Sequence, residues 1–223
     1  MTDGPGDGRA LAAGSPLRTP RAAGVAGIVF SVLLILCIVL LRISVPEDVS
    51  QPGLWLTDSG RRSSVALALG LVPFAGIAFL WFVGVIRDRI GEREDRFFAT
   101  VFLGSGLLFV GMLFIAAAVA GGLIADVAAS SAPSHAVATV ALGRRITSIA
   151  LNVYAMRMAA VFTTTTAMIG LRTGAISRWL GIVGLVFAVV LLFGMGLSSW
   201  VALLFPAWIG AVSVEILLTQ WRA

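Results

Sequence analysis

The chain has 223 residues, of which 59% are hydrophobic and only 12% are charged, and its formal net charge is +5. Soluble globular domains carry about 25% charged residues, so this composition excludes an ordinary soluble domain and indicates an integral membrane protein. The positive charge does not indicate nucleic-acid binding, because no long basic run or soluble domain could hold a nucleic acid. The lipid bilayer is therefore the first expected partner.

The N-terminal segment, residues 1–20, is rich in Gly, Pro and Ala with scattered Arg. Such a segment buries too little apolar surface to offset the conformational entropy lost on ordering. We predict a disordered cytoplasmic tail over residues 1–20, followed by one transmembrane domain over residues 21–223.

Six apolar stretches fill that domain, and each is long enough to cross a hydrocarbon core of about 30 Å at about 1.5 Å per helical residue. The predicted fold is all-α, a polytopic membrane bundle of six transmembrane helices. Their expected ranges are 22–41, 65–86, 97–125, 146–171, 179–197 and 200–218. The last two divide one long apolar run, with a hinge expected at Gly194 to Ser199, where two glycines and two serines favour a turn.

Arginine placement predicts the orientation. With six spans, ten of the sixteen arginines lie on the side of the two termini and five on the other side. Cytoplasmic loops carry the excess of basic residues, so both termini are expected in the cytoplasm. Trp179 and Trp221 would then mark the cytoplasmic interface, and Trp55 and Trp200 the opposite one.

Arg157 lies near the middle of the expected fourth helix, where a charge costs about 2.5 to 3.5 kcal/mol, so its side chain should face the bundle interior or water. Tyr154, Thr164 and Thr165 share its helical sector. Glu215 of the sixth helix lies about 12 Å away along the axis, so a direct salt bridge is not favoured. The stripe is either an interhelical strut or a pathway for an anion, substrate or proton, and we prefer a hydrated outward-facing cavity that reaches Arg157.

The expected third helix contains many small residues, which let membrane helices approach closely. This favours a central position in the bundle or a seam between copies. The candidate helix-packing residues are Gly104, Gly106, Gly111, Gly121 and Gly122.

The sequence contains no catalytic motif. G-x-S-x-G, H-E-x-x-H and Walker A patterns are all absent. Cys37 is the only cysteine and His135 the only histidine, so neither a disulfide nor a Cys/His metal cluster is expected. We therefore expect no enzymatic activity, no cofactor and no metal.

Two segments carry a resemblance. Gly91 to Phe98 with the small-residue helix that follows, and Ser177 to Gly181 continuing to Leu204 to Trp208, resemble uncharacterised polytopic membrane proteins of GC-rich bacteria. The resemblance implies a bacterial inner-membrane location and no particular activity.

Two functional hypotheses follow. The first is a non-catalytic accessory or scaffold subunit that packs against another membrane protein or a second copy of itself. The alternative is a small transporter or channel that uses a polar pathway centred on Arg157. An enzyme acting on lipid is a distant third, and no substrate can be named from the residues.

Overall fold

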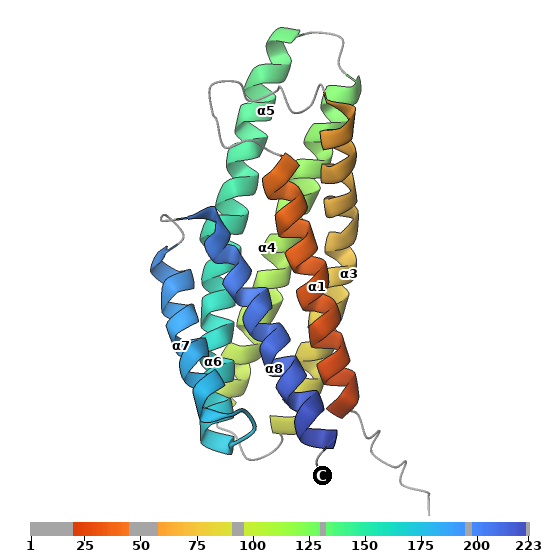
Figure 1. The fold of residues 1–223 in the computed structure, drawn as a ribbon. Helices are drawn as coiled ribbons and strands as arrows, with labels where there is room; N and C mark the ends of the chain where they lie inside the picture. The colour runs from red at the N-terminus through yellow and green to blue at the C-terminus, as the bar shows by residue number, and fades with distance from the viewer. Residues whose placement is uncertain (1–19, 45–57, 91–95, 130–132, 195–197, 222–223) are drawn as a thin grey trace, which may run out of the picture.

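The computed structural model describes residues 20–44, 58–90, 96–129, 133–194 and 198–221, and every element in these ranges is helical (Figure 1). Five helices are long and apolar enough to cross a membrane, and a sixth is shorter. The predicted all-α class is confirmed in this form. The predicted tail falls outside the described residues except for Pro20, and so does Trp55.

The first three helices are α1 (Pro20–Ser44), α3 (Ser59–Ile90) and α4 (Arg96–Ala129). Each contains the predicted apolar range and continues into polar residues at its ends. At the start of α3, Asp58 caps the helix, because its Oδ1 atom accepts a hydrogen bond from the backbone N–H of Gly60 at 2.8 Å. Hydropathy alone ends a helix too early, since capping side chains extend it beyond the apolar run.

The next three elements are α5 (Pro133–Ser148), the π-helix η2 (Ile149–Ala155) and α6 (Met156–Thr173), and they follow one another without a break. Figure 1 shows them as one rod that projects beyond the other helices. The prediction of a helix over 146–171 was therefore too short, because α5 is too polar for a hydropathy criterion. The rod ends at Gly174, whose φ of 71° is left-handed and suits glycine.

The chain then folds back through α7 (Arg178–Phe193), the 3-10 turn η4 (Ser199–Leu203) and α8 (Leu204–Trp221). The fold-back falls at the predicted hinge, and Ser198 caps the new helical segment by accepting from the N–H of Trp200 at 3.3 Å. However, α7 ends at Phe193 rather than at residue 197, and its 16 residues make it the shortest of the six apolar helices.

The bundle has two distinguishable ends (Figure 1). We call the end at which α1 begins and α8 ends the terminal end, and the end at which α5 projects the α5 end. The core is centred on five fully buried phenylalanines, one from each of five helices, with contacting ring centroids 4.7 to 6.3 Å apart. This phenylalanine cluster consists of Phe30, Phe79, Phe109, Phe162 and Phe205.

Candidate functional site

A cavity of about 260 Å³ lies between α1, α3, α4 and the α5–η2–α6 rod, on the α5 side of the phenylalanine cluster. Its floor is apolar. Each floor residue shares a continuous helical segment with one phenylalanine of the cluster and lies about one or two helical turns from it. The floor residues are Leu34, Val72, Leu113, Met156 and Ala202. The packed cluster therefore closes the cavity on the side of the terminal end.

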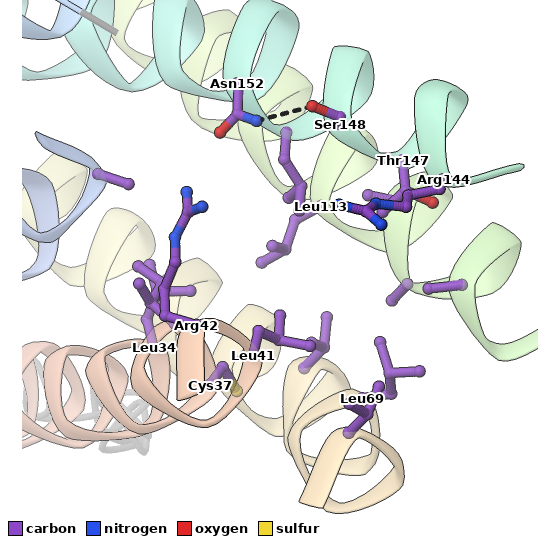
Figure 2. Close-up of a pocket in the computed structure, with 18 of the residues that line it drawn as sticks. Leu34, Cys37, Leu41, Arg42, Leu69, Leu113, Arg144, Thr147, Ser148 and Asn152 are labelled. Atoms are coloured by element: carbon purple, nitrogen blue, oxygen red, sulfur yellow. Dashed lines mark hydrogen bonds between the residues drawn. The ribbon is translucent and has the colours of Figure 1, made fainter. Parts of the chain in front are cut away.

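The helix arrangement keeps this space open. α1 packs against α3 and α8, whereas α5 packs against α4 and η2, so α1 and α5 form opposite walls (Figure 2). At the α4–α5 contact the backbones approach closely, since a Cβ added to Gly143 would lie 2.5 Å from Leu123. Between Leu113 and Leu123, α4 presents only the small side chains of Ala116, Ala117 and Ala120 to the cavity. Small residues on one wall and divergent helices on the other leave the volume unfilled.

The rim of the cavity is polar. Arg42 extends from the last turn of α1, and Arg144 extends from α5 on the opposite wall (Figure 2). Ser148 and Asn152 follow Arg144 at steps of four residues, and Nδ2 of Asn152 donates to Oγ of Ser148 at 3.0 Å. Asp and Glu are absent from the described residues that line the cavity. The described rim therefore contains two arginines together with the polar side chains of Ser148 and Asn152.

Thr147 also lines the cavity, and its hydroxyl oxygen is buried without a hydrogen-bond partner within the described ranges. Buried hydroxyls are nearly always paired, so an unpaired one at a cavity wall indicates a missing partner. The π-helix η2 begins directly after this turn and contributes Leu151 and Asn152 to the lining. Short π-helical stretches occur frequently at functional sites.

Arg157 lies outside this site. Its side chain is exposed on the surface of the bundle, and its Nη1 atom donates to the carbonyl oxygen of Val153 at 3.0 Å. Tyr154 is also exposed, with 56% of its area accessible. The expectation that Arg157 faces the bundle interior is wrong, and Arg157 does not line the cavity described above.

The physical reason lies in the length of the rod. Arg157 is about 24 Å from Thr173 by the rise per residue, so in a core of about 30 Å it comes close to the edge nearer the α5 end. Side chains in a helix lean toward its N-terminus, which here is the α5 end. A long arginine in this position can reach the interface along the bundle surface instead of entering the interior.

The other candidates of the polar stripe do not form a connected pathway. Thr164 is exposed and Thr165 buried, and their hydroxyls donate to the carbonyls of Ala160 and Val161 at 2.9 and 2.8 Å. Such bonds to the preceding turn satisfy a hydroxyl within its own helix. The carboxylate of Glu215 lies at the terminal end, where it accepts from the N–H and the hydroxyl of Ser177 at 2.6 and 3.1 Å. Glu215 thus holds the start of α7 against α8.

The candidate packing glycines of α4 divide unevenly. A Cβ on Gly106 would lie 3.3 Å from the ring of Phe162, so this glycine does contact a neighbouring helix. A Cβ on the other four would meet no described atom within 4 Å, so close packing inside the bundle is not found for them, and the alternative of a seam between copies stays a prediction: Gly104, Gly111, Gly121 and Gly122. The buried face of α4 is formed by larger residues such as Phe102 and Phe109.

Hydropathy did not indicate the cavity residues, because Arg144 precedes the predicted helix over 146–171. A signal was present, since Arg144, Ser148 and Asn152 recur every four residues and so share one helical face. Among the described residues, no group of three His, Cys, Asp or Glu side chains could hold a metal ion.

Comparison with known protein families, with curated proteins and with solved structures found no match to this chain. The resemblance carried by Gly91 to Phe98 and by Ser177 to Trp208 accordingly stays a prediction.

Proposed function

We propose that this chain is a non-catalytic accessory protein that holds one amphiphilic molecule in its cavity. The observation that carries the proposal is the combination of an apolar floor with a polar rim around about 260 Å³. Binding pockets for small molecules are typically apolar concavities of about 300 to 1,000 Å³ with a few convergent polar groups. A volume just below this range suits one apolar chain and its head, rather than a whole two-chain lipid.

The same proposal includes six spans, a bacterial inner membrane and cytoplasmic termini. The ten-to-five arginine distribution supports the orientation, in which the α5 end faces away from the cytoplasm. For α7, a length of about 24 Å is short for the hydrocarbon core, but local thinning of the bilayer accommodates such a helix at modest cost. In a Cys37→Ala background, a cysteine introduced at Ser134 should react with an impermeant maleimide on intact cells. Labelling only after permeabilisation would reverse the orientation.

An accessory role fits the position of the cavity relative to the phenylalanine cluster. The cluster closes the floor, so a bound chain is held in the half of the bundle nearer the α5 end. The transporter alternative is less favoured, because Arg157, on which its polar pathway is centred, is exposed and does not line this cavity. Transport through the cavity would require the five phenylalanine rings to separate.

A matched pair of α4 variants tests the proposal. Ala120 lines the cavity, whereas Ala118 is exposed on the other side of the helix. We expect Ala120→Phe to fill the cavity and to remove the amphiphile that co-purifies with the protein in mild detergent, detected by native mass spectrometry. Ala118→Phe should retain it.

Two results would change the conclusion. If both variants retain the same bound molecules, or the parent protein retains none, then the cavity is not a binding site and the proposal is wrong. If the protein moves the amphiphile across liposome membranes and Ala120→Phe abolishes that movement, a transport function replaces the accessory one.

A further inference from the structure

We infer that the cavity selects an uncharged single-chain lipid of the monoacylglycerol class, whose ester carbonyl accepts a hydrogen bond from the hydroxyl of Thr147. The inference rests on the proposed function and adds the chemistry of the ligand. It follows from the unpaired hydroxyl, from the apolar walls around it, and from the interactions that already engage the other polar residues of the cavity.

The hydroxyl of Thr147 behaves differently from those of the buried threonines in α6. Thr163 and Thr166 each donate to the carbonyl oxygen four residues earlier, at 2.8 and 2.7 Å. Thr147 has the carbonyl of Gly143 in the same place on α5, yet its buried Oγ1 atom has no partner among the described residues. A buried donor without an acceptor loses its hydration and gains nothing in return. An acceptor that enters the cavity beside Thr147 would therefore be stabilised.

Apolar side chains face Thr147 and flank it along the rod. Across the cavity lie Leu41 of α1 and Leu69 of α3 (Figure 2). On the rod itself, Val140 precedes Thr147 by two helical turns and Leu151 follows it by four residues, and both line the cavity. These neighbours offer no side-chain acceptor. The acceptor must therefore come from a molecule in the cavity, at a point next to its apolar chain.

The other polar side chains of the cavity already have interactions. Nδ2 of Asn152 donates to Oγ of Ser148 at 3.0 Å, which joins two of them. Arg42 and Arg144 each interact with another group, so neither charge is assigned to the ligand. Thr147 is therefore the position at which a ligand would gain a hydrogen bond without breaking one.

The surroundings of Thr147 favour an uncharged acceptor. A lipid chain that leaves the bilayer for the cavity exchanges one apolar environment for another, so its burial supplies little preference. One neutral hydroxyl does not offset the desolvation of an anionic head group, whereas it is a sufficient partner for a carbonyl oxygen. In a monoacylglycerol, the ester carbonyl stands at the end of the acyl chain, so the chain can occupy the apolar floor while the carbonyl meets Thr147. A threonine in a helix occupies either of two side-chain rotamers, so its hydroxyl can turn to this carbonyl without a backbone movement.

The experiment uses the full-length protein in detergent micelles that contain monoolein, its ether analogue and oleate in equal amounts. The ether analogue has the same chain and glycerol head, but a methylene group replaces the carbonyl. Native mass spectrometry counts the bound molecules of each kind. We expect monoolein to be retained about fivefold over the ether analogue, because one neutral hydrogen bond changes a binding constant by about this factor.

Thr147→Val keeps the shape of the side chain but removes the hydroxyl, so monoolein and the ether analogue should then be retained equally. Thr147→Ser keeps the hydroxyl and should keep the preference. The matched control is Thr164→Val, since Thr164 lies on the same rod but is exposed, bonds to the carbonyl of Ala160 and does not line the cavity. This variant should prefer monoolein as the parent protein does.

A second measurement does not require lipid binding. Replacing an unpaired buried hydroxyl by a methyl group of similar size is neutral or stabilising. The melting temperature of Thr147→Val in detergent without added lipid should therefore equal or exceed that of the parent protein. A marked decrease would show that the hydroxyl is paired within the protein and would overturn the inference.

The outcomes separate this inference from the proposed function. Equal retention of monoolein and the ether analogue by the parent protein, with loss of both in Ala120→Phe, would overturn the inference and leave the binding function intact. A preference for monoolein that persists in Thr147→Val, or a preference for oleate, would also overturn the inference alone. So would retention of none of the three by a protein that still carries its co-purified amphiphile. Retention that Ala120→Phe does not change would overturn both.

Discussion

The two halves of this bundle use the same hydrophobic character to opposite effect. Toward the terminal end, fully buried phenylalanine rings from five helices pack against one another. Toward the α5 end, leucine, valine and alanine line a cavity of about 260 Å³. Hydropathy is high in both halves, so the difference lies in side-chain volume and helix divergence. Polarity places helices in a membrane, and shape decides whether the space between them is solid or hollow.

The polar contacts follow the same division. Near the terminal end, hydrogen-bonding groups are used to tie helices together, as in the contacts from Glu215 to Ser177 and from Nε1 of Trp208 to the carbonyl of Leu180 at 3.0 Å. The guanidinium of Arg172 lies 4.7 Å from the ring centre of Phe98. Near the α5 end, Arg42, Arg144 and Thr147 instead surround the cavity. The first set ties helices together, whereas the second set lines the cavity.

The largest expected loss of stability comes from truncating a side chain of the phenylalanine cluster. Phe79 contacts four other rings of the phenylalanine cluster and is fully buried, so Phe79→Ala should cost about 3 to 5 kcal/mol of stability. A large drop in the melting temperature in detergent would show it. Phe74 lies on the same helix with 62% of its area exposed, and Phe74→Ala should leave the melting temperature nearly unchanged. Equal losses would mean that the cluster is not the centre of stability.

Larger side chains should destabilise the packed half of the bundle but not the half that contains the cavity. A Cβ on Gly184 of α7 would lie 2.7 Å from the ring of Trp208, so Gly184→Ala should cost about 1 to 3 kcal/mol as the buried ring shifts. Ala117→Leu adds more volume but directs it into the cavity, and the melting temperature should stay within the range of the parent protein. If Ala117→Leu is the more damaging change, the cavity is filled in the native protein.

The tie between α7 and α8 should have a smaller effect. Glu215→Ala removes both acceptors of Ser177, and because Glu215 is only half-buried we expect a loss of about 1 kcal/mol. Glu215→Gln keeps an oxygen for the backbone N–H and should lose less. Thermal melting of the two variants side by side measures the difference. A Gln variant as unstable as the Ala variant would show that the negative charge, rather than the acceptor geometry, is what matters.

The smallest effect is expected at Arg157, which belongs to neither half. Its side chain lies on the surface and bonds within its own helix, so Arg157→Met should change stability by less than about 0.5 kcal/mol. Retention of the bound amphiphile should also match the parent protein, in contrast to Ala120→Phe. A large loss of either property would show that the surface around Arg157 contacts a partner in the membrane.

Much of the fold was predictable because hydropathy is a local property. The membrane class, five long apolar helices and the fold-back near Gly194 all follow from stretches that can be read without their neighbours. The projecting helix α5 was missed, because its polar residues fail an apolar criterion although they still form a helix. The candidate site was misplaced for a related reason. Arg157 lies near the middle of the predicted helix over 146–171, but the continuous helical rod begins earlier, at Pro133, so the depth of Arg157 in the membrane could not be inferred from the apolar range alone.

The sequence by itself determined that this chain is a helical membrane protein, because long uncharged runs have no stable alternative to spanning helices. It also determined which residues carry charge near the helix ends. Only the tertiary structure decided which of those charged residues line the same cavity. Arg42 and Arg144 are 102 residues apart in the chain and face one cavity, while Arg157 and Glu215, paired as candidates, lie apart. The physical reason is that helix rotation and divergence are set by the packing of side chains such as Phe79 and Ala120 across several helices, and no single segment contains that information.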